Sequence, residues 1–103
     1  MQSKVEIDVM GAKWEFVFDD LFPYSDVAEI WVDEKTVTVD NKARSSLPML
    51  TFILTDYVAQ AYLLEADYTF DGTTRGMSLF IAHYAEDILT DVNKIIMELG
   101  CED

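Results

Sequence analysis

The sequence predicts an α+β fold, in which an antiparallel sheet of two β-hairpins (about four strands) is followed by two helices packed on one face. Two patterns lead to this prediction. Over residues 1–40 apolar and polar residues alternate, which is typical of half-buried strands. From Ser46 onward apolar residues recur at intervals of three and four, which is typical of helices. We expect residues 1–103 to form a single domain, because a chain of this length buries roughly 65% of its unfolded surface and cannot build two cores.

The first predicted hairpin joins residues 5–9 to residues 14–18. The dipeptide Gly11-Ala12 fits a type II′ turn, which favours glycine at its first central position. This turn fixes a register that brings the apolar residues of both strands to one face. The expected pairs are Val9 with Trp14, Ile7 with Phe16 and Val5 with Phe18. On the other face the register places Asp8 opposite Glu15, so we expect an acidic outer surface.

The second predicted hairpin follows residues 19–26, which we expect to form a loop because Pro23 interrupts them. Its inward positions are apolar and comprise Ala28, Ile30, Val32, Val37 and Val39. Its outward positions are Glu29, Trp31, Thr36 and Thr38. Among these, Trp31 is the one large apolar side chain. Residues 41–46 are expected to be a polar connection.

A long apolar helix is predicted after this connection. Ser46 is a suitable N-cap, and Pro48 in the first turn needs no N–H partner. The helical stripe consists of Leu47, Leu50, Ile53, Leu54, Tyr57, Val58, Ala61 and Leu64. The opposite side is only weakly polar and consists of Thr51, Thr55, Ala59 and Leu63. We therefore expect the helix to be packed on two sides or covered by another chain. An alternative interpretation ends the helix near Ala59 and makes residues 62–70 a strand.

The last predicted helix spans residues 77–99, about six turns, and Gly100 follows as its C-terminal stop. Before it, residues 71–76 are expected to form a turn. In an alternative interpretation, residues 79–81 begin as a strand paired with residues 68–70.

The balance of charge restricts the possible partners. The chain has 20 acidic and 7 basic residues, for a formal net charge of −13. Phosphate backbones and anionic membranes repel such a chain, so we expect neither direct nucleic-acid binding nor membrane binding. The apolar run at 47–64 is interrupted by polar residues and is expected in the core of the fold. The start of the chain resembles a strand rather than a signal peptide, and Cys101 is the single cysteine, so we expect a cytoplasmic protein.

No constellation for catalysis or for a cofactor is apparent. His83, Glu86 and Asp87 have the spacing of one helix face and could hold a metal ion. Since a second ligand motif is missing, a solvated helix face is the preferred interpretation. Asp19-Asp20 is interpreted as a charged strand end, and the acids beside Cys101 oppose formation of a thiolate. We predict no enzyme, no cofactor and no metal, and no motif of a known family is apparent.

Size, charge and the missing catalytic set together predict a small acidic inhibitor. It would cover the basic surface of a nucleic-acid-acting enzyme, as an immunity protein covers a toxin nuclease or a phage protein blocks a defence nuclease. Outward carboxylates would supply the charge, and an outward aromatic residue would supply an anchor. The predicted partner-binding residues are Glu15, Glu29, Trp31, Asp33, Glu86, Asp87 and Asp91.

The alternative function is a homo-oligomeric structural or assembly protein of phage or chaperone type, without catalysis. It rests on Ala59 and Leu63, which a homodimer through the first helix would bury. An enzyme on a small α+β scaffold is a third hypothesis, and no assembled nucleophile, metal or phosphate motif supports it.

Overall fold

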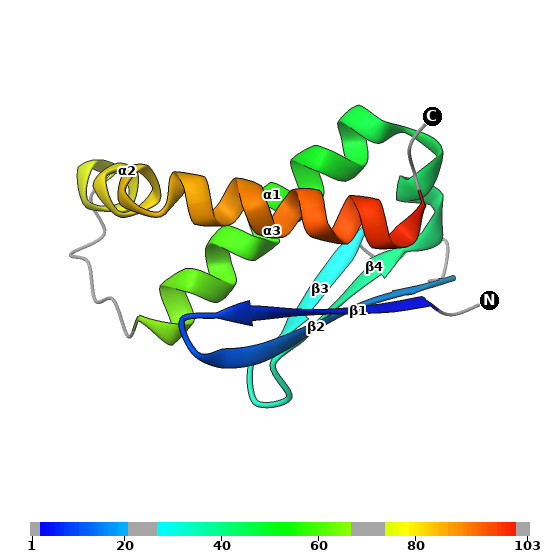
Figure 1. The fold of residues 1–103 in the computed structure, drawn as a ribbon, viewed down its shortest axis with the longest axis horizontal. Coiled ribbons are helices and arrows are strands. Elements are labelled where there is room, and N and C mark those ends of the chain that lie inside the picture. Colours follow the sequence, from blue (N-terminus) through cyan, green and yellow to red (C-terminus); the bar gives the residue numbers. More distant parts are fainter. Residues whose placement is uncertain (1–2, 21–26, 67–73, 101–103) are drawn as a thin grey trace.

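A four-stranded sheet and several helices make up the fold (Figure 1). The structure, a computed structural model, describes residues 3–20, 27–66 and 74–100, with the backbone alone for residues 74–78. The strands are β1 (Ser3–Val9), β2 (Ala12–Asp19), β3 (Ala28–Trp31) and β4 (Thr36–Asp40). The helices are the 3₁₀ helix η1 (Asn41–Ser45) and the α-helices α1 (Leu47–Glu65), α2 (Thr74–His83) and α3 (Ala85–Leu99). The predicted α+β class is confirmed.

The order of the strands in the sheet is β1-β2-β4-β3. β1 pairs with β2, and β3 with β4, in antiparallel directions, but β2 and β4 run parallel. The prediction of an antiparallel sheet is therefore wrong, because the sheet is mixed. Val37 and Val39 of β4 are completely buried, whereas the short β3 ends at the exposed Trp31. The more apolar, β-branched strand thus occupies the centre, and the short strand occupies an edge.

The register between β1 and β2 differs from the predicted one by two residues. The observed pairs include Val5 with Phe16, Ile7 with Trp14 and Val9 with Ala12. The turn therefore consists of Met10 and Gly11, whose φ angles of 52° and 89° are both positive, as in a type I′ turn. A shift of two residues leaves every side chain on its predicted face. It also places Asp8 opposite Lys13 instead of Glu15, which replaces repulsion by attraction.

β3 and β4 pair as Ala28 with Val39 and Ile30 with Val37. Val32 does not point inward as predicted, because β3 ends where Trp31 pairs with Thr36, and Val32 is 51% exposed in the turn. Trp31 is exposed, as predicted, and its indole N–H donates a hydrogen bond to Oγ1 of Thr38 over 3.2 Å. Of the predicted loop before β3, residues 21–26 lie outside the described residues.

α1 buries most of the predicted apolar stripe, but Leu47 and Leu64 at its two ends are exposed, which the prediction had wrong. The Ser46 hydroxyl accepts a hydrogen bond from the N–H of Met49 over 3.4 Å, which confirms the predicted N-cap. The helix continues to Glu65, so the alternative strand from Tyr62 is wrong as far as the structure describes it, and its part from residue 67 lies outside the described residues. By length and composition alone α1 could cross a membrane. In this fold it packs on the sheet and on α3 through Leu50, Ile53, Leu54, Val58, Ala59, Ala61 and Tyr62.

The predicted unbroken helix over residues 77–99 is divided at Tyr84, which has φ −103° and ψ 13°. The N–H of Tyr84 donates to the carbonyl of Phe80 over 3.2 Å, and its own carbonyl accepts from the N–H of Ile88 over 2.9 Å. The first bond closes the end of α2 and the second opens α3, while the apolar spacing continues through the break. The sequence pattern therefore gives no sign of it.

The ends of this helical region differ in how well they are predicted. α2 begins at Thr74, so the predicted turn at residues 71–76 is wrong for its last three residues, and its first three lie outside the described residues. Residues 79–81 are helical, so their alternative interpretation as a strand is wrong. Gly100 follows α3 with a left-handed φ of 74°, which confirms the predicted C-terminal stop. Within the predicted polar connection at residues 41–46, residues 41–45 form η1 and Ser46 caps α1.

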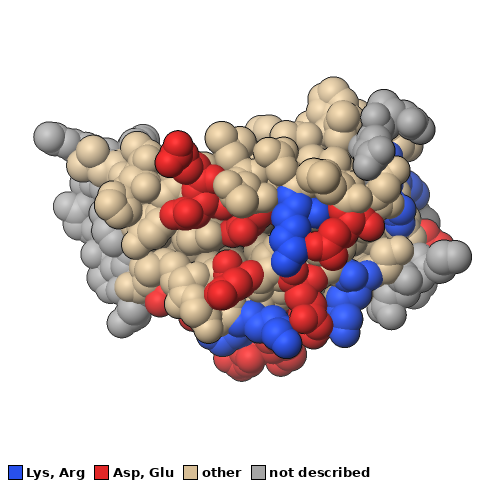
Figure 2. Space-filling view, viewed as in Figure 1, with Lys and Arg blue, Asp and Glu red and all other residues tan. Residues whose placement is uncertain are grey.

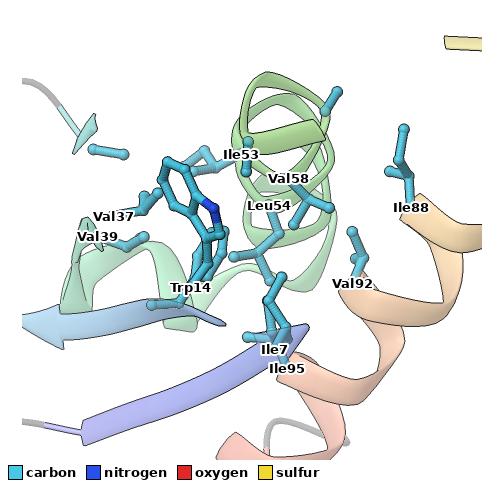
Figure 3. Close-up of a cluster of buried hydrophobic side chains, with 14 of the residues drawn as sticks. Ile7, Trp14, Val37, Val39, Ile53, Leu54, Val58, Ile88, Val92 and Ile95 are labelled. Atoms are coloured by element: carbon cyan, nitrogen blue, oxygen red, sulfur yellow. The ribbon is translucent and has the colours of Figure 1, made fainter. Parts of the chain in front are cut away.

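The core lies between the inner face of the sheet and helices α1 and α3 (Figure 3). Its fully buried side chains include Ile7, Trp14, Leu54, Val58, Val92 and Ile95. α3 packs along β1, where Nζ of Lys94 donates to the backbone carbonyl of Glu6 over 2.9 Å and covers part of the sheet edge. The guanidinium of Arg44 donates to Oγ of Ser3 over 3.4 Å and to the carbonyl of Leu99 over 3.3 Å. These contacts join the start of β1 to the end of α3.

A polar contact attaches the end of α1 to the sheet. The Glu65 carboxylate accepts a hydrogen bond from the indole N–H of the buried Trp14 over 2.7 Å, and it pairs with Nζ of Lys35. The Lys35 hydrogen bond lowers the pKa of Glu65 against the opposing effect of burial, and the Trp14 hydrogen bond adds to the lowering. The ionised carboxylate therefore stabilises the folded state.

Candidate protein-binding surface

The structure divides the seven predicted partner-binding residues between two surfaces. Glu15, Glu29, Trp31 and Asp33 lie on the outer face of the sheet or in the turn beside it. Glu86, Asp87 and Asp91 lie in the N-terminal half of α3. The two sets therefore come from different elements, the sheet with its turn and helix α3 (Figure 1).

Two carboxylates of the outer sheet face have basic neighbours. Glu15 pairs with Lys4 over 3.6 Å, and Glu6 pairs with Lys13 over 3.4 Å. In Figure 2, acidic side chains nearer the α2 end lie without Lys or Arg among them, whereas those nearer the termini alternate with basic side chains. The expected acidic outer face is therefore partly neutralised at Glu6 and Glu15. On the face of the molecule that Figure 2 shows, the carboxylates without a basic neighbour are those toward the α2 end.

Three carboxylates form a cluster beside α3, which we name the acidic patch: Asp8, Asp87 and Asp91. Asp8 comes from the end of β1, and its backbone leads into the turn at Met10 and Gly11. The Tyr62 hydroxyl donates a hydrogen bond of 2.6 Å to Oδ2 of Asp91, so the patch rests on the end of α1. A shallow pocket of about 290 Å³ opens there, lined by Asp8, Met10, Gly11, Tyr62, Tyr84 and Asp87. The packing of β1 beside α3 thus brings carboxylates from both ends of the chain to one place.

The acidic patch is electrostatically strained. Burial raises the pKa of Asp91, and the charges of Asp87 and Asp8 raise it further, against the Tyr62 hydrogen bond and the charge of Lys94. Burial also raises the pKa of Tyr62 well above its usual range, helped by its hydrogen bond to Asp91 and by the charges of the patch. The phenol therefore remains a neutral donor at physiological pH. A cation beside the patch would relieve the crowding of negative charge.

The metal interpretation of His83 loses its geometric basis. His83 ends α2, and its ring meets Tyr84 edge-on with the centroids 4.7 Å apart. Because the chain leaves helical geometry at Tyr84, Glu86 and Asp87 do not share a continuous helix face with His83. The part of the chain that the structure describes contains no cluster of three or more His, Cys, Asp or Glu that could hold a metal ion. Cys101 lies outside the described residues.

A second feature, which we name the apolar groove, lies between α1 and the α2–α3 pair. It has a volume of about 430 Å³, and its lining includes Phe52, Asp56, Ala59, Ile81, Ile88 and Leu89. Phe52 is 75% exposed and Leu89 is 55% exposed. By contrast, Ala59 is 7% exposed and Leu63 is half-buried against the core. The expectation that Ala59 and Leu63 lie on an outer face is therefore wrong. The exposed apolar side chains of this region are Phe52 and Leu89.

Comparisons with known proteins leave the surface to be interpreted on its own chemistry. No family model matches this chain, and no curated protein or solved structure gives a significant match.

Asp87 and Asp91 are both among the predicted partner-binding residues, and their i,i+4 spacing puts them on one side of α3. The prediction did not include Asp8 and Tyr62 as members of the same site. Asp8 alternates with apolar residues in β1 and so indicated only an outer strand position. For Tyr62, the sequence predicted only a position near the end of a helix. Their meeting with α3 depends on tertiary packing, for which the sequence pattern carries no signal.

Proposed function

We propose that this protein is a small acidic binding protein that covers the basic surface of a nucleic-acid-acting enzyme, in the manner of an immunity protein or a phage anti-defence protein. In this proposal it acts in the cytoplasm, without catalysis or cofactor, and contacts neither nucleic acid nor membrane directly. One observation carries the proposal: Asp8, Asp87 and Asp91 gather at one place, and among the described residues none of them forms an ion pair with Lys or Arg.

Local structural roles account for only part of this arrangement. Asp87 lies in the first turn of α3, where a negative charge favours the helix dipole. Asp91 is one turn further along and lacks this benefit. Asp8, at the end of β1, instead accepts a hydrogen bond from the N–H of Gly11 in the turn over 2.9 Å. The carboxylate of Asp91 is also half-buried against its own preference for water. Groups held at such a cost to stability are common at functional sites.

The charge of the whole chain supports a basic partner. A net charge of −13 is larger than solubility requires of a small domain. Such a field accelerates the encounter with a basic protein. Arg and Lys side chains that otherwise bind phosphate oxygens can bind carboxylates in the same way. We favour the α3 surface over the outer sheet face for this contact, because Asp8, Asp87 and Asp91 lie together there. On the sheet, lysines compensate Glu6 and Glu15.

The first experiment identifies the partner. The tagged protein is incubated at low salt with a lysate of the source cell, bound proteins are released by a salt step, and mass spectrometry identifies them. We expect a basic nuclease or another basic nucleic-acid-binding enzyme. The purified partner should then lose its activity on nucleic acid when an equimolar amount of this protein is added.

The second experiment locates the contact through the salt dependence of the partner's Kd. Asp87→Asn/Asp91→Asn and the control Glu29→Gln/Asp33→Asn each remove two negative charges and keep side-chain size. We expect the first pair to weaken binding about tenfold or more and to reduce the salt dependence, and the control to change Kd less than about threefold. Equal effects of both pairs, or a Kd that is independent of salt, would contradict the proposal.

The alternative function is that of a homo-oligomeric assembly protein. Its contact between copies would involve the exposed Phe52 and Leu89 in place of Ala59 and Leu63. Sedimentation velocity over a range of concentrations tests it. A monomer at the highest concentration would speak against a dimer.

A further inference from the structure

The apolar groove is a second surface of this molecule with the features of an interaction site. Monomeric proteins expose single apolar side chains freely, but a concave cluster of them usually marks an interaction site. Here Phe52 of α1 and Leu89 of α3 both line the groove and are largely exposed, while Ile88 and Ala59 form its buried floor. The groove runs between helices, which is the shape that receives an amphipathic helix in other complexes.

The charges beside the groove indicate what kind of helix fits. Asp56 lines the groove one turn after Phe52 on α1, and the exposed Glu86 lies one turn before Leu89 on α3. Each exposed apolar side chain is therefore accompanied by a carboxylate on its own helix. Among the described residues, no Lys or Arg lines the groove. A ligand with apolar side chains flanked by basic ones would satisfy both features.

The same charges disfavour a second copy of this chain as the occupant. Two copies facing each other across the groove would each carry a net charge of −13 and would bring their Asp56 and Glu86 side chains toward one another. Like charges placed together across an interface oppose association. Charge complementarity therefore points to a basic partner.

We propose that the apolar groove binds the apolar face of a basic amphipathic helix, presented by the same kind of basic partner that the acidic patch attracts. The inference rests on the proposed function and adds the part of the partner that is recognised. The N-terminal half of α3 carries the acidic patch on one flank, through Asp87 and Asp91, and the groove on the other, through Ile88 and Leu89. The patch steers the partner, and Phe52 and Leu89 act as the apolar anchors.

The test uses three defined helical peptides of 18 residues at physiological salt. The first has Leu at every third or fourth position and Lys elsewhere. The second replaces Leu by Ala, and the third replaces Lys by Glu. Fluorescence anisotropy gives each Kd, and amide shifts in the ¹⁵N-labelled protein give the location. We expect the Leu/Lys peptide alone to bind tightly and to shift the amides of residues 52–59 and 85–89.

Variants of the protein test the anchors. Phe52→Ser and Leu89→Ser should each weaken binding of the Leu/Lys peptide about tenfold or more. Met97→Ser is the matched control, because Met97 on α3 is 68% exposed, a fraction between those of Leu89 and Phe52, but does not line the groove. It should change Kd less than about twofold. The circular dichroism spectra of all three variants should match that of the parent protein.

The outcomes separate this inference from the proposed function. If the Ala/Lys peptide binds as well as the Leu/Lys peptide, or Phe52→Ser has no effect, the groove inference is wrong, while the patch variants still test the function. If the Leu/Glu peptide binds as well as the Leu/Lys peptide, the occupant is not a basic helix. If the protein forms a dimer and Phe52→Ser makes it monomeric, the occupant is a second copy of this chain. If the Leu/Lys peptide binds the groove but Asp87→Asn/Asp91→Asn does not change the partner's Kd, the proposed function is wrong and the groove inference stands.

Discussion

Tyr62 donates a hydrogen bond of 2.6 Å to Asp91, and this contact joins the end of α1 to α3 beneath the acidic patch. Tyr62→Phe removes the hydroxyl and leaves a half-buried carboxylate without that donor. We expect a loss of about 1–2 kcal/mol in the free energy of unfolding, measured by urea denaturation at pH 7. Tyr84→Phe is the control, because its hydroxyl makes no hydrogen bond among the described residues, and it should change stability by less than about 0.5 kcal/mol. Equal losses in both variants would contradict a specific role for the Tyr62–Asp91 bond.

Asp91→Asn should not destabilise the protein at pH 7. Folding raises the pKa of Asp91, so the stability that its protonated form contributes is fully present below the unfolded pKa, about 3.9, and is lost as pH rises through the folded pKa. Asn keeps an acceptor for Tyr62 and carries no charge. We expect an unchanged or higher urea midpoint at pH 7, and an advantage over the parent protein that shrinks toward pH 3. A large loss at pH 7 would show that the negative charge of Asp91 stabilises the fold.

Glu65 should show the opposite dependence on pH. Its pKa is lowered in the folded state, so its contribution is present above the unfolded pKa, about 4.3, and is lost as pH falls through the folded pKa. Glu65→Ala leaves the buried indole N–H of Trp14 without its acceptor, and we expect a loss of about 2 kcal/mol at pH 7. Glu65→Gln retains an acceptor and should lose less. Urea denaturation at pH 7 and pH 3 checks both variants, and the differences from the parent protein should narrow at pH 3.

The turn between β1 and β2 offers a stabilising substitution. Met10 has a φ of 52°, which asparagine adopts more readily than methionine, and Asn-Gly is the favoured pair for a type I′ turn. We expect Met10→Asn to raise the free energy of unfolding by about 0.5 kcal/mol or more. Ala12→Asn is the control, since Ala12 lies in β2 and asparagine is unfavourable in strands. A gain from Ala12→Asn and none from Met10→Asn would favour the turn at Gly11-Ala12 instead.

The sequence is informative about which face a side chain occupies and much less so about which strands are neighbours. Val5, Ile7, Trp14 and Phe16 are buried in either register, because a slip of two residues preserves the faces. The choice of register depended on the turn and on the pairing of Asp8 with Lys13, which alternation does not contain. The parallel pairing of β2 with β4 was equally inaccessible, because each strand alternates in the same way whatever its neighbour.

The same limit applies to the surface. Asp87 and Asp91 follow from helical spacing, and the break at Tyr84 leaves that spacing intact. Asp8 and Tyr62 join them only after β1 and α1 pack against α3, and the exposed Phe52 appears within a helix whose stripe looks uniformly apolar. Local periodicity predicts elements and faces, whereas contacts between distant segments decide the site.

The bonds from Arg44 to Ser3 and Leu99 have a practical consequence. Because one guanidinium holds both segments, the two ends of the described chain leave the molecule on the same side, far from the α2 end (Figure 1). A surface tether or a fluorescent label at either end would therefore project away from the acidic patch and the apolar groove. A short linker from Gly100 to Ser3 could also close residues 3–100 into a ring, and this cyclised form should resist fraying while the acidic patch and the apolar groove stay open to solution.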